Sequence, residues 1–278
     1  MKLLFGKPVA EKILSRLKSD ISLLEKKPGL AVILIGTDSA SHIYVNLKEK
    51  MAREIGMNFF RFDFSEGVSQ DEISTLIDKL NADADVHGVI VQLPLPESFD
   101  TEKIIASIAP EKDVDGFHPE NSKAFLEGEG AILPVFPRAI TLLMQSAEEN
   151  LAGKKAVILA NSAEFGMIMS TMLSRQNIDA EYILAEKIPS NLRQIKGADI
   201  VVSAMGSPEL VKGEMLKDGA IVIDGGIEKV GEKVFGDVDF GSTETLSGHI
   251  TPVPGGVGPV TIACLLDNVF LAFEAQQR

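Results

Sequence analysis

The chain has 278 residues, of which 45% are apolar and 24% are charged. That balance excludes a disordered or fibrous protein, and the length favours two domains over one. Acidic residues outnumber basic ones by 40 to 27, so the net charge disfavours nucleic acid and anionic membrane surfaces as partners.

The first eight residues contain Gly6 and Pro8 before any apolar stretch reaches signal-peptide length, and no later run approaches membrane-spanning length. The single cysteine, Cys264, excludes an intrachain disulfide and leaves no thiolate cluster for a metal. We therefore expect a cytoplasmic protein with no membrane partner and no metal site.

Short apolar runs rich in Val and Ile alternate with helix-length amphipathic segments. This alternation predicts an α/β fold in which parallel sheets are covered by helices. It occurs before about residue 125 and again after about residue 153, with a connection rich in Gly and Pro between the two parts. The expected strands are residues 30–35, 86–93, 156–159, 200–204 and 220–224.

A helix capped by Asp38 or Ser39 is expected directly after the first of these strands. Ser41, Tyr44 and Lys48 stand at i, i+3 and i+7 in this helix, so they share one face. The face would lie near the carboxyl end of a parallel strand, where α/β folds bind ligands. Spacing alone does not distinguish such a site from an ordinary exposed helix face.

Two further segments carry polar side chains. Gln92 lies near the end of a buried strand that Pro94 must stop, and a buried amide needs partners, either backbone groups or functional ones. Asp113 and Asp115 alternate in a loop ahead of Gly116. Carboxylates at this spacing are common turn-formers and do not indicate a metal site, since supporting His and Cys ligands are missing.

The last segment, residues 258–275, follows a glycine-proline loop and is predicted to be a helix that returns to the first domain. Its apolar face consists of Ile262, Leu265, Leu266, Val269 and Phe273.

Taken in order, these segments resemble the bifunctional methylenetetrahydrofolate dehydrogenase and methenyltetrahydrofolate cyclohydrolase family. The helix carries Ser-x-x-Tyr-Val-x-x-Lys, the strand end carries Val-Gln-Leu-Pro-Leu-Pro, and the loop carries Lys-Asp-Val-Asp-Gly-Phe-His-Pro. The likeness covers nearly the whole chain, because similar signatures follow at residues 198–200, 222–227, 236–240 and 251–261.

The resemblance implies a folate-binding catalytic domain over residues 1–137 with 255–278, and a Rossmann-like NAD(P)-binding domain with a parallel sheet over residues 138–254. It also implies a homodimer. Such enzymes oxidise 5,10-methylenetetrahydrofolate by hydride transfer to a nicotinamide, a step that asks mainly for positioning. They then hydrolyse the methenyl cation to 10-formyltetrahydrofolate.

By the same resemblance, Lys48 moves the protons of hydrolysis with its pKa lowered towards neutrality, and Gln92 orients its amine. Tyr44 contacts the folate with Ser41 in support, while Asp115 reads the pterin ring and Asp113 shapes the loop. A close wall of the cleft is implied for Pro254, Gly255 and Gly256, whose alternative role is a tight turn before the last helix.

The dinucleotide half departs from the family pattern. The implied cofactor-binding residues are Ala160, Asn161, Ser162, Gly166, Glu186 and Ile227. The family implies NADP, yet Asn161 replaces the arginine expected to pair with the 2′-phosphate, which leaves NAD as the alternative cofactor. Glu186 favours NAD as a ribose partner, although Lys187 beside it suits a phosphate. Phe136 adds a bulky ring near the nicotinamide end.

Two other functions stay open from the sequence. One is a cyclohydrolase whose dinucleotide site has degenerated, and the other is a non-catalytic folate or nucleotide sensor that kept the fold. Intact Tyr44, Lys48, Gln92 and Asp115 argue against the sensor, since binding alone does not require the amine.

Overall fold

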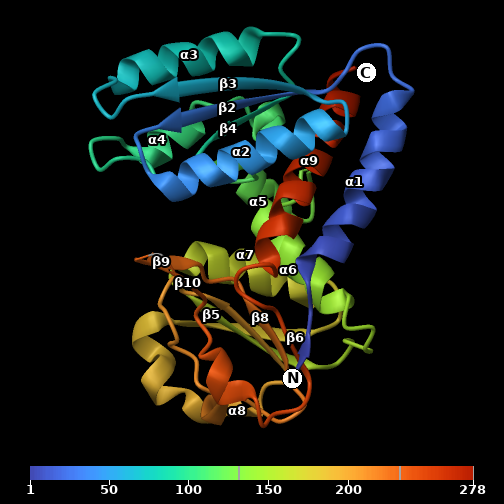
Figure 1. Cartoon of the computed structure of the whole chain (residues 1–278), viewed down its shortest axis with the longest axis vertical. Helices are drawn as coiled ribbons and strands as arrows, with labels where there is room; N and C mark the ends of the chain where they lie inside the picture. Colours follow the sequence, from blue (N-terminus) through green and yellow to red (C-terminus); the bar gives the residue numbers. More distant parts are fainter. Residues whose placement is uncertain (131, 232, 278) are drawn as a thin grey trace. The chain divides into compact units, whose positions relative to one another are not determined.

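The structure is a computed structural model that describes residues 1–130, 132–231 and 233–277. The chain forms two compact units (Figure 1). The N-terminal unit contains residues 11–135 and 262–278, and the C-terminal unit contains residues 1–10 and 136–261. The predicted two-domain α/β class is confirmed.

The N-terminal unit is built on a parallel sheet of order β3-β2-β4. The central strand β2 (Gly29–Ile35) is buried along its whole length between β3 (Asn58–Phe64) and β4 (Gly88–Val91). Figure 1 shows α3 (Gln70–Ala82) and α2 (Ser39–Glu54) on opposite faces of this sheet. Its other helices are α4 (Thr101–Ala106), α5 (Pro119–Glu127) and most of α1 (Gly6–Ser22) and α9 (Val257–Gln276).

The core of this unit on the α3 side explains its stability. Ile73, Ile77 and Leu80 of α3 pack against alternate residues of β2 and β4, and each of the three is at most 5% exposed. Burial of each such side chain contributes roughly 1.5 to 3 kcal/mol. The 3.6-residue period of these three positions is the pattern that seats α3 on the sheet.

The C-terminal unit is built on a six-stranded sheet of order β1-β11-β8-β7-β5-β6, in which every pairing is parallel. Figure 1 shows α6 and α7 covering one face and α8 the other. The strands are β1 (Lys2–Leu3), β11 (His249–Ile250), β8 (Ile221–Asp224), β7 (Ile200–Ala204), β5 (Lys155–Ala160) and β6 (Asp179–Leu184). The helices are α6 (Val135–Gln145), α7 (Ala163–Ser174) and α8 (Leu192–Gly197).

Smaller elements complete the chain. An antiparallel hairpin joins β9 (Glu228–Val230) to β10 (Lys233–Phe235). Single 3-10 turns are formed by Pro110–Lys112, Ala185–Ser190, Gly213–Met215 and Phe240–Thr243.

The five expected strands are present, but the apolar pattern did not reveal β3 and β6. Both are outer strands of their sheets and carry exposed charged residues, so neither forms a continuous apolar run. The expected domain boundaries also differ from the two units. Residues 1–10 pack with the C-terminal unit because β1 pairs with β11 there, and a two-residue strand leaves no periodic signal.

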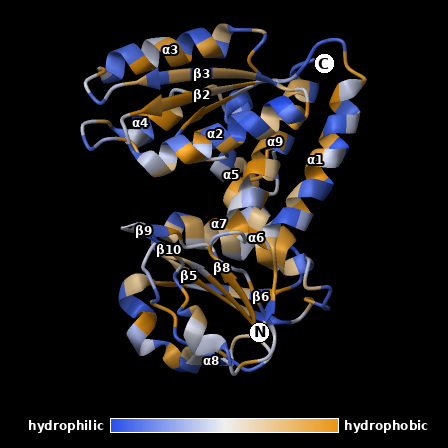
Figure 2. Ribbon diagram, viewed as in Figure 1, coloured by the Kyte–Doolittle hydropathy of each residue, from blue (hydrophilic) through white to orange (hydrophobic). Residues whose placement is uncertain are grey.

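The last helix corrects one expectation. By length and apolar composition, α9 is able to cross a membrane, with a mean hydropathy of 1.5 over its most apolar window, so the expectation that no run approaches that length was wrong. Within the structure, 72% of that window is buried. Figure 2 shows many hydrophobic residues along α9, and such a helix, when mostly buried, is typical of a protein core.

Candidate active site

The helix α2 presents the predicted polar face. Its N-cap is Asp38, whose carboxylate accepts a hydrogen bond from the Ser41 N–H at 2.7 Å, which fixes where the helix starts. From that start, Ser41 and Lys48 turn inward and are buried, while Tyr44 between them is half-buried. The i, i+3, i+7 spacing therefore places all three on the side of α2 that meets the unit.

Gln92 accepts a hydrogen bond from the amine of Lys48 in this helix. Its backbone N–H donates to the Ile33 carbonyl at 2.8 Å, which extends the pairing of β4 with β2 by one residue. Its side-chain nitrogen donates to the Leu93 carbonyl at 2.6 Å, so its side-chain oxygen is free to accept the Lys48 Nζ at 2.9 Å. The half-buried amide of Gln92 thus has both a backbone partner and the lysine.

The two carboxylates of the acidic loop, those of Asp113 and Asp115, have different surroundings and different roles. Asp113 is buried and accepts hydrogen bonds from the Gly116 and His118 N–H groups, at 3.2 and 2.8 Å, and from the Asn121 side chain at 2.9 Å. The prediction that Asp113 shapes the loop is confirmed. Asp115 is half-buried, and its charge acts on Lys48.

Burial shifts the pKa values of Lys48 and Asp115 in one direction, and the charge of the other residue shifts each of them in the opposite direction. Burial lowers the pKa of the Lys48 amine, and the Asp115 carboxylate acts to raise it. Burial likewise raises the pKa of the Asp115 carboxyl, and the Lys48 ammonium acts to lower it. Burial is the larger cause in both residues, so the site favours a neutral amine more than water does. A lowered pKa is what a lysine needs in order to act as a base.

The wall residues belong to the C-terminal unit. Gly255 has a φ of +107°, and its carbonyl accepts the Gly6 N–H at 2.8 Å. A Cβ on Gly256 would lie 2.7 Å from the Pro252 carbonyl oxygen. These glycines therefore form the tight turn that starts α9, while Pro254 beside them is exposed.

The predicted dinucleotide residues gather at the carboxyl edge of the sheet in the C-terminal unit. Ala160 ends β5, and the exposed residues Asn161 and Ser162 lead into α7, where the Ser162 hydroxyl caps the helix by accepting the Phe165 N–H at 3.2 Å. A Cβ on Gly166 would lie 2.5 Å from the ring of Tyr182. Gly166 thus allows α7 to approach β6 closely.

The remaining predicted dinucleotide residues, Glu186 and Ile227, follow other strands of the same sheet and lie at the same edge. Glu186 is exposed just beyond β6, and Ile227 is 53% exposed just beyond β8. The rings of Phe136 and Phe165 lie 5.5 Å apart between centroids, and a Cβ on Gly225 would meet the Phe136 ring at 2.8 Å. The added aromatic ring therefore lies over the end of β8.

Two buried acids that the sequence did not single out organise this edge. Asp224 accepts the Gly226 and Asp237 N–H groups at 3.1 and 2.9 Å, and Asp237 accepts the Ser203 hydroxyl at 2.8 Å. Together they fix the loop that carries Ile227. One of them could have been found from the sequence, since Asp224 ends an apolar strand directly before two glycines. A carboxylate at the end of a buried strand must accept hydrogen bonds from nearby donors.

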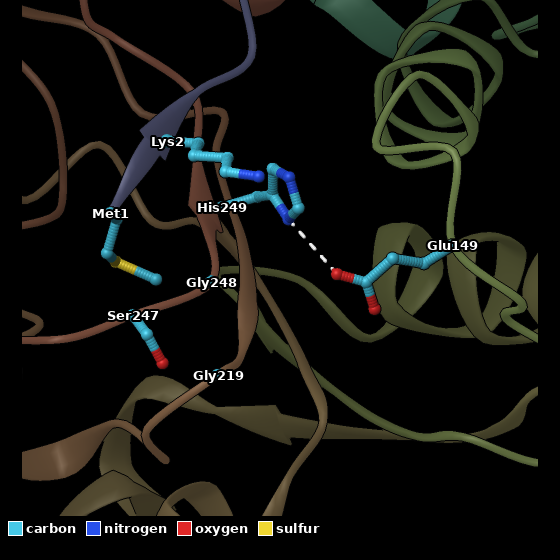
Figure 3. Close-up of a pocket in the computed structure, with 7 residues that line it drawn as sticks. All are labelled: Met1, Lys2, Glu149, Gly219, Ser247, Gly248 and His249. Atoms are coloured by element: carbon cyan, nitrogen blue, oxygen red, sulfur yellow. Dashed lines mark ion pairs between the residues drawn. The ribbon is translucent and has the colours of Figure 1, made fainter.

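A cavity of about 460 Å³ lies elsewhere in the C-terminal unit (Figure 3). Its lining includes Lys2, Glu149 and His249, with His249 Nδ1 and Glu149 Oε1 3.2 Å apart. Lys2 and His249 start β1 and β11, and Glu149 lies between α6 and β5, at the edge of the sheet opposite the one that holds Asn161 and Ile227. The cavity is therefore separate from the candidate dinucleotide site.

Comparison with known proteins is consistent with this geometry. Residues 4–115 match the catalytic-domain model of tetrahydrofolate dehydrogenase/cyclohydrolase, and residues 134–277 match the model of its NAD(P)-binding domain. The chain is 39% identical to the bifunctional protein FolD of Geotalea uraniireducens, covering 100% of this chain and 99% of that protein. The bifunctional protein FolD of Acetivibrio thermocellus is 41% identical, with 100% and 98% covered.

Solved structures show the same likeness. The bifunctional FolD enzyme of Campylobacter jejuni is 38% identical and superposes with a TM-score of 0.93, covering 99% of each chain. The Trypanosoma brucei enzyme, solved with NADP and an inhibitor, is 33% identical with a TM-score of 0.93, covering 99% of this chain and 98% of that one.

Proposed function

This chain belongs to the tetrahydrofolate dehydrogenase/cyclohydrolase family, and from that membership we propose that Lys48 is the catalytic base of its hydrolytic step. The protein is a methylenetetrahydrofolate dehydrogenase and methenyltetrahydrofolate cyclohydrolase. The hydrogen bond from Lys48 to Gln92 within a buried setting is the observation that carries the assignment. A hydrolase-only enzyme and a sensor are not favoured, because the match extends over both domains.

The hydrolytic step needs a group that takes a proton and later returns it. Water attacks the methenyl carbon while the neutral Lys48 amine takes one water proton. The resulting ammonium gives that proton to the folate nitrogen as its bond to the carbon breaks, and the remaining hydroxyl proton leaves to solvent as the formyl C=O forms, so one proton is released overall. Burial favours the neutral amine, and the cationic substrate favours it further. Gln92 accepts an N–H of the amine and so directs the lone pair elsewhere.

The remaining residues of the N-terminal unit hold the folate in this proposal. Half-buried Tyr44 stacks on or hydrogen-bonds the ring system one helical turn before Lys48, and buried Ser41 supports it. The Asp115 carboxylate accepts N–H bonds from the aminopyrimidine edge of the pterin.

The residues at the carboxyl edge of the C-terminal unit fit a nicotinamide dinucleotide. The N-terminus of α7, exposed at Asn161 and Ser162, suits a diphosphate because its N–H groups and dipole favour anions. Gly166 brings the helix close, and exposed Ile227 offers an apolar contact. A bound nicotinamide supplies the hydride acceptor, and these side chains only hold and orient it.

We further propose that NAD is preferred to NADP. Asn161 is uncharged, whereas the exposed carboxylate of Glu186 beyond β6 suits the hydroxyls of an unphosphorylated ribose and repels a 2′-phosphate. Only Lys187 beside it opposes this preference. Initial rates with each dinucleotide at fixed methylenetetrahydrofolate test the proposal. A higher kcat/KM for NADP+ than for NAD+ would contradict it.

The role of Lys48 is tested with Lys48→Met, which keeps the apolar stem and removes the amine. We expect methenyl hydrolysis to fall by about 10²-fold or more, the usual contribution of a positioned acid-base group. Lys50→Met is the matched control, since Lys50 is exposed on the same helix. Hydrolysis by Lys48→Met at the parental rate would refute the assignment.

The assembly and location are also proposals. We expect a homodimer formed through the C-terminal units. We also expect a cytoplasmic enzyme, since a chain with a single cysteine forms no intrachain disulfide. Its net charge of -13 argues against nucleic acid as a partner.

A further inference from the structure

Helix α9 carries a buried amide that bridges two distant segments of the N-terminal unit. The side-chain nitrogen of Asn268 donates to the Val114 carbonyl and to the Leu133 carbonyl, both at 2.8 Å. Asn268 is 0% exposed, so water does not replace these bonds if they are lost. One side chain therefore satisfies two backbone acceptors that lie far from it in sequence.

Both segments that Asn268 bridges are also attached to the backbone of Asp115. Val114 precedes it directly, and the N–H of Val135, two residues beyond Leu133, donates to the Asp115 carbonyl at 3.1 Å. Gly116 follows with a φ of +80°, and a Cβ there would lie 2.9 Å from Pro134 Cα. Asp115 is thus held between the acidic loop and the segment before α6.

The strand side of this loop is closely packed as well. A Cβ on Gly88 of β4 would lie 2.7 Å from a methyl of Val114 and 3.1 Å from a methyl of Val269, which is the α9 residue after Asn268. Val89 of β4 also bridges to Asp113. The loop is therefore fixed between β4 and α9, and Asn268 is its polar attachment to the helix.

We propose that Asn268 is a positioning residue for the hydrolytic reaction, which holds the backbone on both sides of Asp115 so that its carboxylate faces Lys48 and the pterin. This inference rests on the proposed roles of Lys48 and Asp115. Asp115 is the charged group that acts on Lys48, and Asp113 and Lys48 are the charged groups that act on Asp115. Displacing Asp115 removes the negative charge that raises the Lys48 pKa, so the lowering of that pKa by burial is no longer opposed.

The sign of the effect on Lys48 follows from these charges. Asp115 raises the pKa of the Lys48 amine, so moving the carboxylate away lets that pKa fall further. The limb of the pH–rate profile on which methenyl hydrolysis rises with pH then shifts to lower pH. Loss of the carboxylate contact to the pterin raises KM by roughly tenfold, as expected for a hydrogen bond to a charged group.

The experiment compares Asn268→Ala with Leu266→Ala, a truncation of another fully buried residue of α9. We expect both to lower Tm, but only Asn268→Ala to shift the pH midpoint down and raise KM. If Asn268→Ala is insoluble, Asn268→Leu, which keeps the volume and removes the donor, is measured in its place. An unchanged pH midpoint and KM in the variant that folds would overturn the inference.

A second arm separates a local effect from a general one. If Asn268 acts through Asp115, the double variant with Asp115→Asn has the same pH midpoint as Asp115→Asn alone. Additive shifts would show that Asn268 acts by another route and would overturn the inference. The parent and Lys48→Met are assayed alongside them, so a parent that does not hydrolyse, or a Lys48→Met that does, reports failure of the proposed function instead.

Discussion

The contact between Lys48 and Gln92 makes a prediction at the scale of one residue. Gln92→Glu places a carboxylate about where the amide oxygen accepts the Lys48 amine at 2.9 Å. An opposite charge at that distance raises the lysine pKa, so a smaller fraction of the amine is neutral at pH 7. We expect hydrolysis at pH 7 to fall at least about tenfold and to recover as the pH rises.

The pH–rate profile of Gln92→Glu is the measurement, with Gln92→Met as its matched control. Methionine has a similar length and no charge, so it removes the orienting bond without adding a carboxylate. A loss of activity that is equal at every pH in both variants would count against a titrating lysine.

Single residues also show what the sequence can predict. The side-chain spacing in α2 predicted the shared face of Ser41, Tyr44 and Lys48, since a capped helix has a fixed period. Spacing did not indicate the partner of Lys48, because Gln92 reaches it only through the pairing of β4 with β2, and only the family resemblance pointed to Gln92. The role of Asn268 was hidden for the same reason, since its acceptors are backbone carbonyls that carry no residue signature.

At the scale of elements, the contact of His87, which precedes β4, with helix α9 predicts that the free energy of unfolding depends on pH. His87, which precedes β4, is 1% exposed, and its Nδ1 accepts the Gly29 N–H at 3.0 Å, while its ring meets Phe273 of α9 edge-on at 4.9 Å. Burial, followed by the charges of Lys26 and Lys112, lowers its pKa to about 4. The folded protein thus holds the neutral ring.

The sign follows from linkage. The unfolded chain protonates His87 near pH 6.5, so the stability from the neutral ring is complete above that pH and is lost as the pH falls towards 4. The loss approaches about 3 kcal/mol. Urea unfolding at pH 7.5 and 4.5 measures it, and His87→Asn, which retains an acceptor, should lose less stability over this interval than the parent. An equal loss would exclude His87 as the cause.

Elements differ in how well the sequence revealed them. Buried strands such as β2 and β5 were predicted from apolar runs, because parallel strands covered on both faces have no alternation to confuse the pattern. The outer strand β3 alternates Phe60, Phe62 and Phe64 with Arg61 and Asp63, a period-two signal that a search for continuous apolar runs does not detect. The two-residue β1 is too short for any period, and its partner β11 lies near the other end of the chain.

At the scale of the whole molecule, the outer edge of the six-stranded sheet offers a surface for a second copy. β6 is the last strand of the order, Tyr182 on it is 37% exposed, and Met167 on the neighbouring helix α7 is 44% exposed. Contact at this edge would cover apolar surface and pair an outer strand. We therefore predict that the proposed homodimer forms through β6 and α7.

Tyr182→Asp tests this interface, because a charge buried without a partner costs several kcal/mol and should separate the subunits. Sedimentation velocity of the parent should report a dimer of twice the 29.9 kDa chain, and the variant a monomer. Leu192→Asp is the matched control, since Leu192 is 45% exposed on α8 of the same unit, away from β6. A monomeric parent would contradict the homodimer, whereas a dimeric Tyr182→Asp, or dissociation by the control alone, would place the interface elsewhere.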